Sequence, residues 1–157
     1  MSDRQYPLQI DCVWIASDRN GRLGAFITAG ESPIPAEVFN QAFVDVPDIE
    51  AQIYAMPVVG EAWLVITPPR PDSYIALAER GFHVFDWTDI HRSTATSLDA
   101  YELVATPERS AGIEALPHEL GPIAAGIRFA EIDFGSEPNL DVRAHKSCVE
   151  AGWPEDN

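Results

Sequence analysis

The sequence predicts an α+β fold, in which a mixed or mostly antiparallel sheet has helices packed on one face. The first observation is an early hairpin pattern: apolar, β-rich residues 12–16 and 23–28 flank the pair Asn20-Gly21, which favours a tight turn. The second observation comes from the chain after this hairpin. Apolar segments whose hydrophobic period is near 2 alternate there with segments whose period is near 3.6, so strands separated by helices are expected.

Four helices are predicted after the hairpin. The first covers residues 35–42 and begins with a proline, whose missing N–H costs nothing in a first helical turn. The second covers residues 47–56 and has acidic side chains in its first turn, where the helix dipole favours them. The third covers residues 72–80 and ends before a glycine, a common helix C-cap. A short fourth helix is expected at residues 116–125.

Four further strands are predicted at residues 62–66, 82–87, 101–105 and 127–134. The segment 62–66 is uniformly apolar, which is typical of a strand buried on both faces. Trp63 in that segment and Trp14 in the hairpin are therefore expected in the core. The predicted order of elements is β-β-α-α-β-α-β-β-α-β.

One domain is expected, because 157 residues match the usual size of a single folding unit. We place this α+β domain at residues 1–134. Residues 135–157 are polar and lack hydrophobic periodicity, so they are predicted to form a polar C-terminal tail. If the tail packs on the domain, the residues available to it are Leu140, Val142, Val149 and Trp153.

The charge balance limits the partners. With 25 acidic and 10 basic side chains the net charge is −15. Such a polyanion is repelled by phosphate backbones and by anionic membranes, so neither nucleic acid nor a membrane surface is expected as partner. A basic protein partner is compatible with the charge. The absence of a signal-like apolar segment at the N-terminus predicts a soluble, cytoplasmic protein.

Motifs for cofactors and covalent catalysis are missing from the sequence. Cys12 and Cys148 make no disulfide framework and have no metal-finger spacing, so reduced thiols are expected. No glycine-rich nucleotide loop and no G-x-S-x-G elbow occurs. We therefore expect no cofactor and assign no catalytic residue.

The densest cluster of reactive side chains consists of His83, Asp86, Asp89 and His91. Imidazoles and carboxylates are ligands for transition metals and groups for acid/base catalysis, so a metal-dependent or acid/base enzyme is the alternative function. On a strand, however, His83 and Asp86 lie on opposite faces, and all four groups converge only if the chain bends sharply. The other interpretation is a turn bracketed by the two acids, with both imidazoles in solvent.

Two tryptophans lie near acidic residues and are candidates for contact with a partner. The predicted partner-binding residues are Trp87, Asp86, Asp89 and Trp153. The alternative for both tryptophans is a partly buried position at the edge of the fold. A homo-oligomer is also possible if the apolar segment 62–66 lies at an edge of the sheet.

The stretch from Asp11 to Phe26, followed by Thr28-Ala29-Gly30 and Pro33-Ile34-Pro35, resembles the N-terminal hairpin of small, uncharacterised bacterial proteins. Some of those proteins resemble the immunity proteins of polymorphic-toxin systems. The resemblance implies an acidic, non-enzymatic protein that binds and masks a basic toxin, and it carries over no functional residue. The sequence thus predicts a protein-binding module, with the enzyme as alternative.

Overall fold

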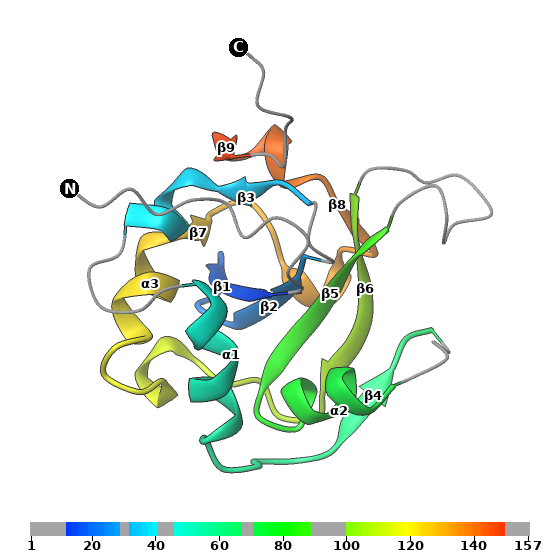
Figure 1. Cartoon of the computed structure of the whole chain (residues 1–157). Helices are drawn as coiled ribbons and strands as arrows, with labels where there is room; N and C mark the ends of the chain where they lie inside the picture. The colour runs from blue at the N-terminus through cyan, green and yellow to red at the C-terminus, as the bar shows by residue number, and fades with distance from the viewer. Residues whose placement is uncertain (1–11, 29–31, 41–45, 67–70, 89–99, 150–157) are drawn as a thin grey trace.

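The computed structural model describes residues 12–28, 32–40, 46–66, 71–88 and 100–149. It confirms the α+β class. A mixed sheet of seven strands and a second sheet of two strands are combined with three α-helices in these residues (Figure 1). No helix among them is long and apolar enough to cross a bilayer.

The centre of the large sheet consists of β1 (Val13–Asp18), β2 (Leu23–Ile27), β5 (Phe82–Thr88) and β6 (Ala100–Pro107). β1 and β2 form the predicted antiparallel hairpin, and Gly21 in its turn has a φ of 79°, which only glycine adopts without strain. β2 pairs with β5 in parallel, and β5 pairs with β6 in antiparallel orientation. The parallel pair makes the sheet mixed.

Short strands lie at the margins. β4 (Ala62–Leu64) pairs with β6 and forms one edge, and β7 (Arg128–Phe129) pairs in parallel with β1 and forms the other. β8 (Asn139–Leu140) also pairs with β6. The second sheet joins β3 (Ile34–Pro35) to β9 (Cys148–Val149). Segments from the N-terminal and C-terminal parts of the chain therefore meet in that small sheet.

Helices cover one face of the large sheet. They are α1 (Val46–Tyr54), α2 (Asp72–Ala78) and α3 (Gly121–Gly126). The Ser17 hydroxyl on β1 donates to the Ala124 carbonyl of α3 at 2.8 Å. The Tyr74 hydroxyl on α2 donates to a carboxylate oxygen of Asp86 on β5 at 2.7 Å. These contacts hold two of the helices against the same face.

An aromatic cluster occupies the opposite face of the sheet. Its members are Trp14, Phe26, Phe85, Trp87, Tyr101, Phe129 and Phe134. The Trp14 and Phe26 rings stack at 4.2 Å, and the Phe26 and Phe85 rings stack at 4.9 Å. Phe134, from the C-terminal part of the chain, packs edge-on against Phe26 at 5.6 Å. The cluster extends the hydrophobic core to this side of the sheet.

Several expectations about single elements need correction. The apolar composition of residues 62–66 predicts a buried strand, but β4 is an edge strand and Trp63 is 56% exposed. Trp14, by contrast, is buried as predicted. An α-helix is predicted at residues 35–42. Within this range the structure describes residues 35–40, and the chain forms a 3-10 helix there, η1 (Ala36–Asn40).

The last predicted elements are shorter than expected. The helix predicted at residues 116–125 is α3, and the strand predicted at residues 127–134 is reduced to the two residues of β7. The remaining 3-10 helices are η2 (Ile113–Ala115), η3 (Phe134–Ser136) and η4 (Val142–Ala144). The Asp133 carboxylate accepts from the Gly135 N–H and begins η3, which ends the extended conformation.

Part of the segment expected as a polar tail packs on the domain. Leu140 lies opposite Tyr101 in the β6–β8 pair, and both Leu140 and Val142 are buried. Val149 is partly exposed, although its strand pairs with β3, and Trp153 lies outside the described residues. Residues 139–149 are thus attached to the fold, and the division of the chain after residue 134 stays a prediction.

Candidate functional site

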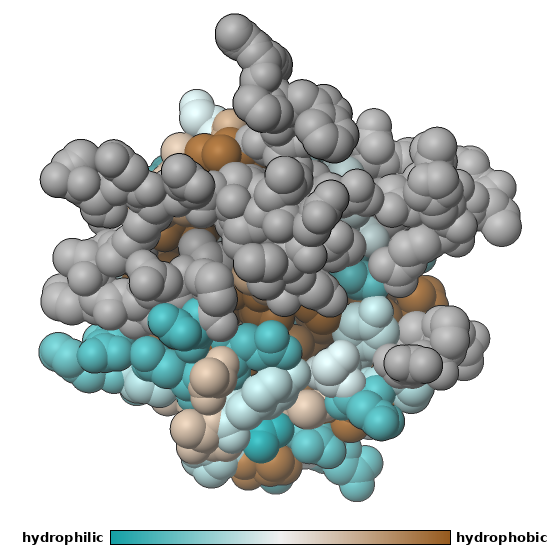
Figure 2. Space-filling model, viewed as in Figure 1, coloured by the Kyte–Doolittle hydropathy of each residue, from teal (hydrophilic) through white to brown (hydrophobic). Residues whose placement is uncertain are grey.

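The largest concentration of exposed apolar side chains lies in residues 58–65, here called the edge segment. Five of the six exposed large hydrophobic side chains among the described residues belong to it: Val58, Val59, Trp63, Leu64 and Val65. Figure 2 shows brown patches among teal ones at the lower rim of the molecule, where Figure 1 places the loop that leads to β4. Clustered exposed apolar side chains mark interaction surfaces.

The backbone of β4 is open on its outer side. The Val65 N–H donates to the Val104 carbonyl, and the Glu61 carbonyl accepts from the Glu108 N–H, both at 2.8 Å. Because backbone groups alternate in direction along a strand, the N–H and C=O groups of Ala62 and Leu64 point away from β6. Within the described parts of the chain no strand pairs with that side of β4.

The loop before β4 is held in place by the end of α2. The Val59 and Gly60 N–H groups both donate to the Glu79 carbonyl, at 2.8 and 3.3 Å. The Arg80 guanidinium donates to the Met56 carbonyl at 3.0 Å and to the Tyr54 carbonyl at 3.3 Å. The edge segment is therefore exposed and also fixed in position, which lowers the entropy cost of binding a partner.

Carboxylates lie within and beside the edge segment. Glu61 and Glu108 are both exposed, and a Glu108 carboxylate oxygen accepts from the Glu61 N–H at 2.9 Å. This bond fixes the Glu108 side chain beside β4. Arg109 follows it in the chain and is also exposed. In a protein of net charge −15, this border adds to a negative field around the apolar strand.

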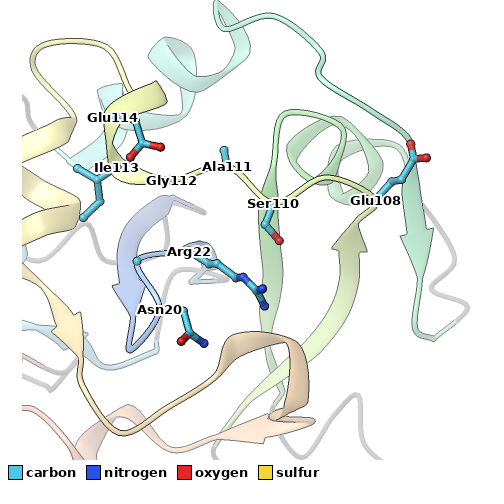
Figure 3. A pocket seen from close by; sticks show the side chains of 9 residues that line it. Asn20, Arg22, Glu108, Ser110, Ala111, Gly112, Ile113 and Glu114 are labelled. Atoms are coloured by element: carbon cyan, nitrogen blue, oxygen red, sulfur yellow. The ribbon is translucent and has the colours of Figure 1, made fainter.

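A polar pocket of about 550 Å³ lies between the β1–β2 turn and the loop after β6. It is lined by residues 20–22, 108 and 110–114. Figure 3 shows the Ser110 hydroxyl and the Arg22 guanidinium directed toward the same part of the pocket, with the Glu108 and Glu114 carboxylates at its margin. The pocket and the edge segment share Glu108 as a border.

His83 lies behind this pocket. The residue is 5% exposed, and its Nε2 lies 3.2 Å from the Ser110 Oγ. Its Nδ1 is buried and has no hydrogen-bond partner among the described residues. Burial lowers the pKa of His83 to about 4; the carboxylates of Asp18 and Asp133 partly oppose this shift, and Arg22 adds to it. The imidazole is therefore neutral near pH 7.

The predicted partner-binding residues are placed differently from the edge segment. Trp87 is buried and packs edge-on against Tyr101 at 5.3 Å. Asp86 is buried beneath α2, where it accepts from Tyr74. Asp89 and Trp153 lie outside the described residues. Two of the four side chains are thus in the interior, although Trp87 has polar neighbours in the sequence and Asp86 is itself charged.

Only two of the four residues of the enzyme hypothesis, His83 and Asp86, are described by the structure, and these two lie on opposite faces of the sheet. His83 faces the aromatic cluster and Ser110, whereas Asp86 faces α2, because alternate residues of β5 point to opposite sides of the sheet. Asp89 and His91 lie outside the described residues. In the part of the chain that is described, no group of three His, Cys, Asp or Glu side chains is placed to hold a metal ion.

The comparisons with known proteins add no relative. No family model matches the chain, and no curated protein or solved structure matches it either. The fold and the two surfaces define an α+β protein with a preformed apolar sheet edge and a separate polar pocket.

Proposed function

We propose that this chain is a protein-binding module whose docking surface is the edge segment and whose partner adds a basic, extended strand to β4. The observation that carries the proposal is the combination of an open strand edge with a 56% exposed Trp63 beside it. Tryptophan is among the residues that most often dominate the energy of protein interfaces.

Apart from its short length of three residues, the exposed edge lacks the devices that usually prevent strand addition. Solvent-facing edge strands commonly carry lysine, an inward-pointing charge or a bulge. β4 has the sequence Ala-Trp-Leu and is followed by the exposed Val65. A partner strand in register would bond to the outward N–H and C=O groups of Ala62 and Leu64, and its side chains would contact Trp63.

Charge favours a cationic partner over a second copy of the chain. Two molecules of net charge −15 repel each other, whereas a partner with lysine or arginine beside its strand would pair with Glu61 and Glu108. A cationic toxin domain, masked by strand addition, is the partner that the resemblance of the N-terminal hairpin implies. With such a toxin domain as its partner, the protein would act as an immunity-type protein.

A peptide titration tests the proposal. The full chain, labelled with ¹⁵N, is titrated with a synthetic peptide of alternating lysine and valine, and with a peptide in which glutamate replaces every lysine. We expect amide shifts centred on Ala62 and Leu64 with the lysine peptide only, and weaker binding as salt is added.

Three variants make the titration specific. Leu64→Pro removes one outward N–H at an edge position that tolerates proline, and Trp63→Ser removes the aromatic contact; both are expected to weaken binding at least about tenfold. Val149→Ser alters an exposed valine elsewhere and should change nothing. Equal binding of the glutamate peptide, shifts away from β4, or dimers that Trp63→Ser dissolves would each overturn the proposal.

A further inference from the structure

The hydroxyl of Ser110 has the surroundings of a reactive nucleophile. Ser110 is exposed and lines the polar pocket, and its Oγ lies 3.2 Å from Nε2 of the buried His83. A hydroxyl within hydrogen-bond reach of a neutral imidazole is the first requirement for serine activation. The two residues are 27 positions apart and are brought together because β5 and the loop after β6 lie side by side.

The imidazole is placed to accept the proton of the hydroxyl. In the tautomer that carries its proton on Nδ1, Nε2 is an acceptor toward Ser110. In that tautomer the Nδ1 proton is buried without an acceptor in the described residues, which has a cost in free energy; the Asp133 carboxylate nearby accepts from the Gly135 N–H and not from Nδ1. The Asp18 and Asp133 carboxylates favour the protonated ring electrostatically. They only partly offset the burial that lowers the pKa of His83 to about 4, and to that extent they reduce the cost of the imidazolium that forms when Ser110 loses its proton.

The opposite wall of the pocket supplies hydrogen-bond donors. Arg22 and Asn20 both line the pocket, and neither side chain makes a hydrogen bond or salt bridge to another described residue. The Arg22 guanidinium is directed toward the same space as the Ser110 hydroxyl (Figure 3). Donors in that position can stabilise negative charge on the oxygen of a reacting carbonyl. The volume of about 550 Å³ accommodates a small acyl donor.

We propose that Ser110 is an acylation site, with His83 as its general base and a small activated ester or thioester as the acyl donor. The Ser110 Oγ forms a bond to the acyl carbon, and the bond from that carbon to the leaving oxygen or sulfur breaks. The Oγ proton moves to Nε2 of His83 and from there to the leaving group. The products are an acyl-serine and a free alcohol or thiol, with no change in oxidation state. The site shares only the border residue Glu108 with the edge segment, Glu108 takes no part in the proposed acylation, and the inference does not rest on the proposed binding function.

Acetylation by p-nitrophenyl acetate tests the inference on the full-length protein. Release of nitrophenolate is followed by absorbance, and the acetylated residue is identified by mass spectrometry of proteolytic peptides. We expect a single acetyl group on each chain, located on Ser110. Ser110→Ala should reduce nitrophenolate release to the rate of buffer, whereas Ser73→Ala, at an exposed serine on α2, should leave the rate unchanged.

Two further variants separate the roles of the neighbours. His83→Gln should slow acetylation on the order of 100-fold, the usual contribution of a general base. Arg22→Gln, at an exposed side chain, should slow it on the order of 10-fold through the loss of an oxyanion donor. If His83→Gln does not fold, the pH dependence of wild-type acetylation replaces it. Because His83 is neutral throughout this range, the acetylation rate should be constant between about pH 6 and about pH 8 once buffer hydrolysis has been subtracted.

Three results would overturn the inference. Acetylation confined to Lys146 or other amines would show that Ser110 is not activated. Equal rates for wild type and Ser110→Ala would show the same without peptide mapping. A wild-type rate that rises steadily with pH would show that hydroxide, and not His83, removes the proton.

Discussion

The Trp14 Nε1–H donates to the Tyr101 hydroxyl oxygen at 3.1 Å, in the middle of the aromatic cluster. The same hydroxyl donates to the Pro33 carbonyl at 2.9 Å and bonds to the Ser32 hydroxyl. One phenol oxygen therefore joins β1, β6 and the loop before β3, and the Trp14, Tyr101 and Ser32 side chains are all buried. A buried indole N–H without an acceptor is costly, so this oxygen is a sensitive point of the core.

Tyr101→Phe is expected to lower the free energy of unfolding by about 1–3 kcal/mol, because the Trp14 N–H and the Pro33 carbonyl lose their shared partner while the ring is kept. Urea unfolding monitored by tryptophan fluorescence measures the change. Tyr54→Phe is the matched control, since the half-buried Tyr54 hydroxyl donates to Glu50 one helical turn away and its removal should cost less. Equal losses for the two variants would contradict the prediction.

Protonation of His83 should make the protein less stable in mild acid. The folded-state pKa is lowered to about 4 from an ordinary 6.5, mainly by burial. Between these values the unfolded chain binds a proton that the folded state does not, so the free energy of unfolding decreases as pH falls from about 6.5 to about 4. The full effect is about 3 kcal/mol, and above about pH 6.5 His83 contributes no pH dependence. The charged groups that act on the ring are Asp18, Arg22 and Asp133.

Unfolding curves across this pH range isolate the His83 contribution when wild type is compared with His83→Gln. The difference between the two should change with pH over the stated window, because acidic residues titrate alike in both. His118→Gln, at an exposed histidine, provides the control and should behave like wild type. Parallel curves for wild type and His83→Gln would show that His83 is not the group responsible.

Gly24 lies beneath the Phe134 ring, and a methyl group there has no space. A Cβ on Gly24 would lie 2.7 and 2.9 Å from two ring carbons of Phe134. Gly24→Ala should therefore cost about 1–3 kcal/mol, as expected for overpacking of a core. A Cβ on Gly126 would meet no atom within 4 Å. Gly126→Ala should therefore stabilise the protein by about 0.4–1 kcal/mol, because alanine lowers the conformational entropy of the unfolded chain. Thermal unfolding of the two variants should show shifts of opposite sign.

Asp18 binds the hairpin turn to a distant part of the chain. One carboxylate oxygen accepts from the Asn20 and Arg22 N–H groups at 2.8 and 3.0 Å, and the other accepts from the Phe134 N–H at 3.0 Å. Asp18→Asn puts an amide donor against backbone donors in a buried site. We expect a loss of about 2–4 kcal/mol in unfolding free energy.

Asp141→Asn is the control for Asp18, because Asp141 makes a similar turn bond to the Arg143 N–H but is exposed. The decrease in unfolding free energy caused by Asp141→Asn should stay below about 1 kcal/mol. Guanidinium unfolding gives both values. A loss for Asp18→Asn as small as that for Asp141→Asn would show that the link to Phe134 carries little of the stability.

The hairpin was predictable because its information is local. Asn20-Gly21 between two apolar segments identifies the turn, and the two strands are defined by it. The exposure of Trp63 was not predictable, because an apolar segment has the same composition in a central strand and at an edge. Only the pairing order of the sheet, which puts β4 outside β6, distinguishes the two.

The burial of β5 and the contacts of the polar pocket could not be predicted from the sequence, for a different reason. The polar neighbours of Trp87 and the charge of Asp86 itself favour surface positions for both, but β5 is covered on both faces. The contact between His83 and Ser110 has no local signature, since it depends on the antiparallel pairing of β5 with β6 and on the loop after β6. Long-range pairing of this kind leaves no periodic mark in one sequence.

The aromatic cluster has a consequence for how the chain is made. The four central strands β1, β2, β5 and β6 are complete once β6 has been synthesised, but Phe129 on β7, Phe134 and Leu140 on β8, which cover the cluster, come later. On the ribosome, Trp14, Phe26 and Phe85 therefore remain open to water until the C-terminal segment that contains these three residues has emerged. During that interval a nascent chain presents an apolar surface that chaperones bind, and early termination before Phe129 would yield an aggregating product.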